Sequence, residues 1–69
     1  MAGPRQLIYK LYSMPYPERI KLLSKLGLYN LELDIDKSDR KTIYEAIERA
    51  QQTKKLKELD EAILEYEKK

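Results

Sequence analysis

The chain has 69 residues, of which 14 are basic and 12 are acidic, and its formal net charge is +2 at pH 7. A chain of this length buries only about 60% of the surface that it exposes when unfolded. Cysteine and histidine are both absent, which excludes disulfides, thiolate chemistry, imidazole bases and the usual ligands of zinc or haem. We therefore expect a single domain, residues 1–69, without a cofactor.

Two helices are predicted before the middle of the chain, at residues 5–13 and 17–26. Pro15 disfavours a helical conformation at the residue before it, which ends the first helix. Pro17 suits the first turn of the second helix, and Gly27 supplies a left-handed stop. The apolar positions at helical spacing are Leu7, Ile8 and Leu11, then Ile20, Leu22, Leu23 and Leu26.

The next segment, residues 28–37, is predicted to be a connector. In it Leu31, Leu33 and Ile35 alternate with Glu32, Asp34 and Asp36. Alternation is typical of a half-buried strand, but no other segment alternates, so no partner strand is available. We expect a partly buried connector or a single helical turn, with its apolar side chains inward and its carboxylates outward.

Two further helices are predicted at residues 39–51 and 54–67. Ser38 is a good N-cap for the first of them. Their apolar stripes are Ile43, Ala46, Ile47 and Ala50, then Leu56, Leu59, Ile63 and Tyr66. The step between the two stripes turns the apolar face by about 120°, so we expect a break near residues 51–54 with Thr53 as a cap. The predicted fold is all-α, a bundle of four to five short antiparallel helices, six at most.

The stretch DIDKSDRKTIYE has the spacing of a calcium-binding loop. Its first, third, fifth and twelfth positions are Asp34, Asp36, Ser38 and Glu45. However, the sixth position, where the sharp turn needs glycine, is Asp39, and the eighth is Lys41. We interpret the stretch as an acidic connector that leads into a capped helix, and we predict no metal site.

Catalytic and nucleic-acid-binding patterns are both weak in this chain. The acids are scattered over charged helix faces and no nucleophile stands in a recognisable motif, so we expect no enzyme and no small-molecule substrate. The six tyrosines would suit base stacking, with phosphate partners in Arg5, Lys10, Arg19, Lys21 and Lys25. We favour the alternative that the tyrosines are half-buried packing residues in place of the missing Phe and Trp.

Charge is unevenly distributed along the chain. Residues 1–27 carry a net charge of +4, residues 28–36 of −3 and residues 37–69 of +1. A basic surface and a separate acidic one would allow head-to-tail contact with another copy or a related domain; the alternative is chance unevenness in a short chain. The candidate contact residues are Arg19, Lys21 and Lys25 on the basic side and Glu32, Asp34 and Asp36 on the acidic side.

Membrane contact is not expected. No apolar run exceeds three residues, and the start MAGPRQLIYK lacks the apolar core of a signal peptide. We expect a soluble, cytoplasmic protein. Its content of Lys, Glu, Ile, Leu and Tyr is compatible with a thermophilic source.

The order of these signals resembles a known family. PYPERIKLLSKLGL, then LELDI and TIYEAIERAQQTKKLKELDEAI, are similar to the effector-associated and other Death-like domains of prokaryotic conflict systems. The resemblance spans roughly residues 5–66. Its matching positions are Leu22, Leu23, Leu26, Gly27, Leu28, Ile47, Ala50, Leu56, Leu59 and Ile63.

The resemblance implies a non-catalytic adaptor that joins proteins by like-with-like contacts and assembles as a dimer or a filament. Its partner would be another copy or a related helical domain. Two alternatives stay open. One is a small nucleic-acid-binding helical regulator, which the nearly balanced charge argues against. The other is a structural subunit that buries the last apolar stripe against a partner helix.

Overall fold

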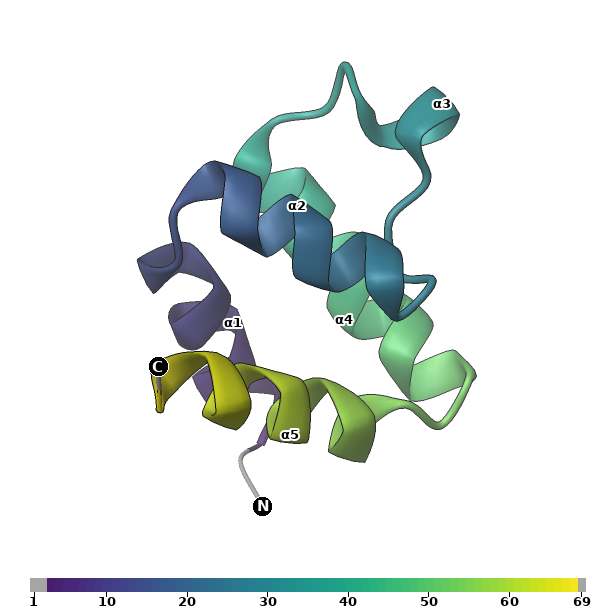
Figure 1. The fold of residues 1–69 in the computed structure, drawn as a ribbon. Coiled ribbons are helices and arrows are strands. Elements are labelled where there is room, and N and C mark those ends of the chain that lie inside the picture. The colour runs from purple at the N-terminus through teal and green to yellow at the C-terminus, as the bar shows by residue number, and fades with distance from the viewer. Residues whose placement is uncertain (1–2, 69) are drawn as a thin grey trace.

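Five helices make up the fold of the computed structural model, which describes residues 3–68 (Figure 1). The helices are α1 (Pro4–Ser13), α2 (Tyr16–Lys25), α3 (Leu31–Asp34), α4 (Asp39–Gln52) and α5 (Leu56–Glu67). No strand occurs within this range, so the all-α prediction is confirmed. Within it, no helix is long and apolar enough to cross a membrane.

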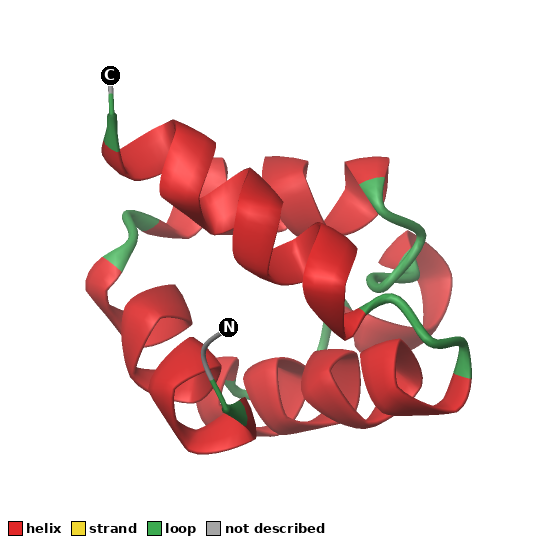
Figure 2. Cartoon of the chain, turned by 90° about the horizontal axis from the view of Figure 1, so that it is seen from below, coloured by secondary structure: helices red, strands yellow, loops and turns green. Residues whose placement is uncertain are grey.

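The core lies where α1, α4 and α5 pack against one another. α2 crosses in front of α4, and α2 and α5 run in opposite directions (Figure 1). The view from below shows the long helices arranged around this core (Figure 2). The buried apolar residues are Leu7, Leu11, Met14, Leu23, Leu28, Ile43, Ala46, Ile47, Ala50, Leu59 and Ile63. Burying one such Leu or Ile side chain contributes about 1.5–3 kcal/mol.

α2 contributes less to the core than its sequence predicts. Of the four apolar residues expected on its inner face, only Leu23 is fully buried, whereas Ile20, Leu22 and Leu26 are half-buried. The predicted stripe of α4 is buried as a whole, and that of α5 is buried at Leu59 and Ile63. Part of the apolar face of α2 is therefore left exposed to solvent beside α5.

The helix ends follow the predicted signals, with one correction. Gly27 ends α2 with φ of 73°, and the hydroxyl of Ser38 caps α4 by accepting from the N–H of Lys41 at 3.3 Å. The predicted break between α4 and α5 is present, but Thr53 does not cap α5. Its hydroxyl donates to the carbonyl of Arg49 at 2.7 Å, so Thr53 closes α4 instead.

The connector contains the short helix α3. The side chain of Asn30 caps it by accepting from two backbone N–H groups, at 2.9 and 3.2 Å. The expected orientation of its side chains is wrong, because Leu33 and Ile35 are 65% and 58% exposed while Asp34 is 1% exposed. The side chain of Leu31 lies outside the described part of the chain. The hydrogen bonds of Asp34 explain this reversal.

Candidate interaction surfaces

Asp34 is the centre of a buried hydrogen-bond network. Its carboxylate accepts from both terminal nitrogens of the Arg49 guanidinium, at 2.7 and 3.2 Å. It also accepts from Lys37 Nζ at 2.9 Å and from the backbone N–H of Asn30 at 2.8 Å. These donors, Arg49 foremost, hold the pKa of Asp34 well below its usual range despite the opposing effect of burial. Asp34 is thus a structural residue that anchors α3 to α4, and it does not belong to an exposed acidic patch.

The two ends of the calcium-loop pattern are joined by a lysine. Lys37 Nζ lies 2.9 Å from the Asp34 carboxylate and 2.6 Å from the Glu45 carboxylate. The hydrogen bond to Glu45, followed by that to Asp34, raises the pKa of Lys37. An ammonium therefore neutralises the two carboxylates that would bind a cation. Within residues 3–68, no group of three or more potential metal-ligating side chains is found.

Arg19 is also buried, contrary to its predicted place on an exposed basic patch. It is 4% exposed. Its Nη1 donates to the carbonyl of Leu11 at 3.1 Å, and its Nη2 lies 3.1 Å from the carboxylate of Asp39. Its guanidinium also lies over the ring of Tyr16, 5.7 Å from the centroid. The free carbonyls at the end of α1 and the acid at the start of α4 account for its inward position.

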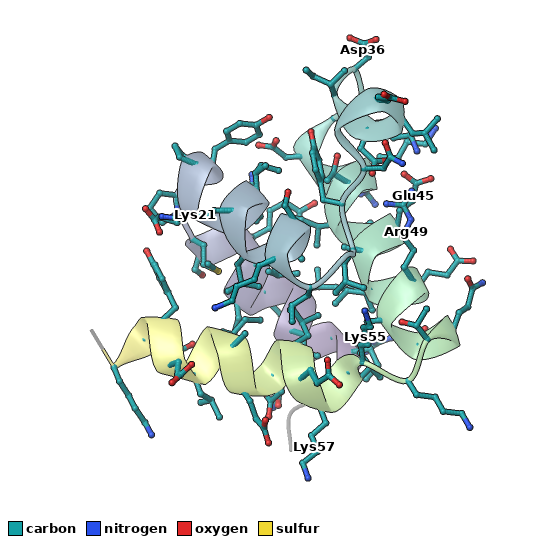
Figure 3. The ribbon with its side chains drawn as sticks, turned by 45° about the vertical axis from the view of Figure 1, so that its right-hand side comes forward. Lys21, Asp36, Glu45, Arg49, Lys55 and Lys57 are labelled. Carbon is teal, nitrogen blue, oxygen red and sulfur yellow. The ribbon has the colours of Figure 1, made fainter. Side chains whose placement is uncertain are left out.

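The remaining four candidate residues are exposed and form two separate surfaces. Lys21 and Lys25 lie on α2 and are called the basic surface here. Glu32 and Asp36 flank the exposed Leu33 and Ile35, and these four residues are called the acidic tip. Figure 3 shows Lys21 on α2 and Asp36 just after α3, well apart on the molecule.

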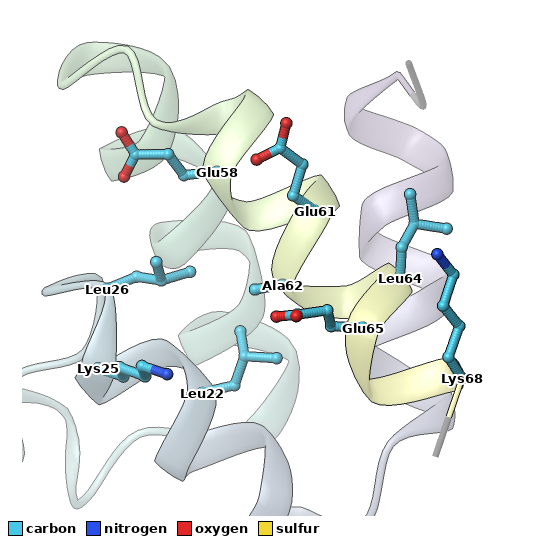
Figure 4. Close-up of a pocket in the computed structure, with 9 residues that line it drawn as sticks. All are labelled: Leu22, Lys25, Leu26, Glu58, Glu61, Ala62, Leu64, Glu65 and Lys68. Carbon is cyan, nitrogen blue, oxygen red and sulfur yellow. The ribbon is translucent and has the colours of Figure 1, made fainter.

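A groove runs between α2 and α5 (Figure 4). Its volume is about 540 Å³. The floor is apolar and consists of Leu22, Leu26 and Ala62. Its α2 wall carries Lys25, and its α5 wall carries Glu58, Glu61, Glu65 and, just after the helix, Lys68. An adjoining cavity of about 520 Å³ shares Lys25, Glu65 and Lys68 with it and adds Glu18 and Lys21 to the α2 wall. We call this feature the α2–α5 groove.

Sequence reasoning missed the groove. It placed Leu22 and Leu26 on the apolar stripe of the second helix and the glutamates of α5 on a charged helix face. The available signal is Ala62, a small residue in the middle of α5 that leaves space opposite the leucines of α2.

The tyrosines only partly confirm the packing prediction. Tyr29 and Tyr66 pack against the core, and burial is the main cause that raises the pKa of Tyr29. The other four are exposed, with Tyr9 the most exposed at 74%. They are Tyr9, Tyr12, Tyr16 and Tyr44.

Comparison with known protein families gives a match. The family model of the GTPase-associated adaptor domain matches residues 3–65. The comparisons with curated proteins and with solved structures find no match. The matched region contains α1 to α4 and most of α5, and the match agrees with the resemblance to small helical adaptor domains of prokaryotic conflict systems. This chain belongs to the family of GTPase-associated adaptor domains.

Proposed function

We propose that this domain is a non-catalytic adaptor that acts through like-with-like contacts between helical domains in prokaryotic immune or conflict signalling. The adaptor family supports the first part of this proposal. The observation that supports like-with-like contact is the presence of two exposed surfaces of opposite charge on one small chain. Because these surfaces are far apart on the molecule (Figure 3), they meet only between copies.

The charges of both surfaces are available to a partner. Among residues 3–68, Lys21, Lys25, Glu32 and Asp36 take part in none of the ion pairs. Opposite charges across an interface raise the rate of association and fix its orientation, and like charges disfavour wrong partners. The basic surface and the acidic tip therefore suit contact with a second copy or a related domain.

The second part of the proposal concerns the physiological partner of the adaptor. Members are described as associated with GTPases. We propose that a related helical domain, fused to or encoded beside a GTPase, is the physiological partner. Titrating such a domain against this chain by calorimetry tests this part, and no heat of binding at low salt would contradict it.

Charge reversal tests the like-with-like contact. We expect the Lys21→Glu, Lys25→Glu chain and the Glu32→Lys, Asp36→Lys chain each to self-associate more weakly than the parent in sedimentation velocity at low salt. A chain with all four reversals should regain association, because the charges are again complementary. Lys57→Glu, an exposed α5 residue away from both surfaces in Figure 3, is the control. A parent chain that stays monomeric at every concentration would contradict the proposal.

A further inference from the structure

We propose that the acidic tip of one copy docks into the α2–α5 groove of the next copy. This inference rests on the proposed function and identifies the two surfaces that make the contact. It predicts a heterologous interface, in which each copy uses its tip on one neighbour and its groove on the other.

The acidic tip has the form of a preorganised apolar anchor. Leu33 and Ile35 are 65% and 58% exposed. Leu33 lies in α3 and Ile35 directly follows it, and α3 projects from the bundle (Figure 1). A four-residue helix is not stable alone, but the Asp34 carboxylate fastens it to Arg49 on α4 at 2.7 Å. A segment that is already ordered loses less conformational entropy on binding. The tip can therefore present its two apolar side chains with little loss of conformational entropy.

The α2–α5 groove has the size and the chemistry to receive them. Its volume of about 540 Å³ falls within the range of about 300–1,000 Å³ that is typical of ligand clefts. Leu22, Leu26 and Ala62 give it an apolar floor, on which two aliphatic side chains can be removed from water. The charged walls leave the rim polar, as in protein–protein interfaces.

Charge complementarity favours this occupant and sets its orientation. The lysines that line the groove suit Glu32 and Asp36, which flank the apolar residues of the tip. They are Lys21 and Lys25 on α2 and Lys68 after α5. The glutamates that line the groove, Glu18 on α2 and three on α5, require positive charge on the same partner. Arg40 and Lys41 supply it, since both are exposed in the first turn of α4, close in sequence to the tip.

The two surfaces do not overlap, so one copy can use both at once. The tip lies at the α3 end of the molecule, and the groove lies between α2 and α5 (Figures 1 and 4). A contact between two different surfaces does not close on itself unless its rotation forms a ring. The expected product is an open assembly with a free tip at one end and a free groove at the other.

Two blocked chains test this contact. The tip-blocked chain carries Leu33→Asp and Ile35→Asp, both at exposed positions. The groove-blocked chain carries Ala62→Glu, which fills the floor and repels the acidic tip. If circular dichroism shows that Ala62→Glu does not fold, Ala62→Gln fills the groove without added charge. Tyr9→Asp adds one negative charge, as Ala62→Glu does, at a 74% exposed position on α1 and is the control.

We expect each blocked chain to be monomeric where the parent and the Tyr9→Asp chain assemble, with self-association weakened about tenfold or more. An equimolar mixture of the two blocked chains should form a 1:1 dimer and grow no further, because one intact tip meets one intact groove. A folded mixture that stays monomeric, or blocked chains that assemble alone, would overturn the inference and leave the proposed function standing. A monomeric parent would instead contradict the proposed function itself.

Discussion

Asp34 is the residue that decides how the middle of the chain is arranged. A buried carboxylate is costly unless it is paired and hydrogen-bonded. Here four donors from Asn30, Lys37 and Arg49 satisfy it. Turning Asp34 inward places its neighbours Leu33 and Ile35 outward, which reverses the pattern that alternation predicts.

Removing the charge of Asp34 should destabilise the fold. We expect Asp34→Asn to lower the free energy of unfolding by about 1.5–3 kcal/mol, the range for hydrogen bonds to charged groups, because the half-buried Arg49 loses its anionic partner. Urea unfolding followed by circular dichroism measures this. Asp36→Asn is the matched control, since Asp36 is exposed, and should change stability by less than about 0.5 kcal/mol. Equal effects of the two changes would contradict the role given to Asp34.

The stability of the fold should depend on pH through the same residue. The pKa of Asp34 in the folded state is lowered below its unfolded value of about 3.9. The group therefore contributes stability above about pH 4, and this contribution is lost as the pH falls through the folded pKa. We expect the stability difference between the parent and Asp34→Asn to shrink as the pH falls below about 4. A difference that stays constant down to pH 2, measured by thermal unfolding, would contradict this.

The sequence alone could not identify the partners of the buried charges. Asp34 and Arg19 were predicted to be exposed because residues near them in the sequence carry charges of the same sign. Their partners Arg49 and Asp39 lie 15 and 20 positions later in the sequence, so only the packed fold brings them together. By contrast, the cap at Ser38 and the stop at Gly27 depend on adjacent residues, and both predictions are confirmed.

At the scale of the elements, two left-handed residues set the turns that follow α2 and α4. Gly27 has φ of 73° and Lys54 has φ of 60°. Glycine adopts this conformation freely, whereas a residue with a Cβ atom is strained by roughly 1–2 kcal/mol. The turn after α2 therefore has a residue suited to this conformation, Gly27, whereas the turn after α4 has a strained one, Lys54.

Opposite substitutions at these turns should have opposite effects. We expect Gly27→Ala to lower the free energy of unfolding by about 1–2 kcal/mol. Its Cβ would lie 3.6 Å from Lys55 Nζ, an ordinary contact, so the cost comes from the backbone. Lys54→Gly should raise stability by about 0.5–1 kcal/mol, because relief of strain exceeds the added entropy of the unfolded chain. Thermal unfolding of both variants measures this, and a stabilising Gly27→Ala would contradict it.

Helix positions were predictable because their signals are local. The observed bounds of α1, α2, α4 and α5 differ by at most two residues from those expected from apolar spacing, prolines and caps. The short α3 could not be predicted from local signals alone, since alternation suits a strand and one turn of helix depends on tertiary contacts. Arg49 supplies such a contact.

At the scale of the whole molecule, surface charge should control assembly. Salt screens exposed charges, with a Debye length of about 10 Å at 0.1 M and about 3 Å at 1 M. We expect self-association to weaken between 50 mM and 1 M salt without disappearing, because the apolar contact of Leu33 and Ile35 remains. Sedimentation velocity at several salt concentrations measures this. Association that strengthens with salt would show that the charged walls play no attractive part.

The all-α fold was predictable from periodicity, but the α2–α5 groove was not. A groove depends on how far two helices stand apart, and this distance follows from the sizes of side chains that meet only in the packed structure. Leu22 and Leu26 have the spacing of core residues, yet they face Ala62, which is too small to cover them (Figure 4).

Arg49 joins both ends of one segment of the chain. Its Nη1 donates to the carbonyl of Leu28 at 3.0 Å as well as to Asp34, so a single side chain of α4 spans residues 28–34. Lys37 adds a second link to α4 through Glu45, but Arg49 is the side chain that contacts both ends of this segment, so its loss should let the segment open as a unit. We expect the amide hydrogens of Asp34 and Lys37 to exchange with solvent deuterium at a common rate, faster than those of the α4 core. Arg49→Gln should speed both together, whereas independent rates would contradict cooperative opening of the segment.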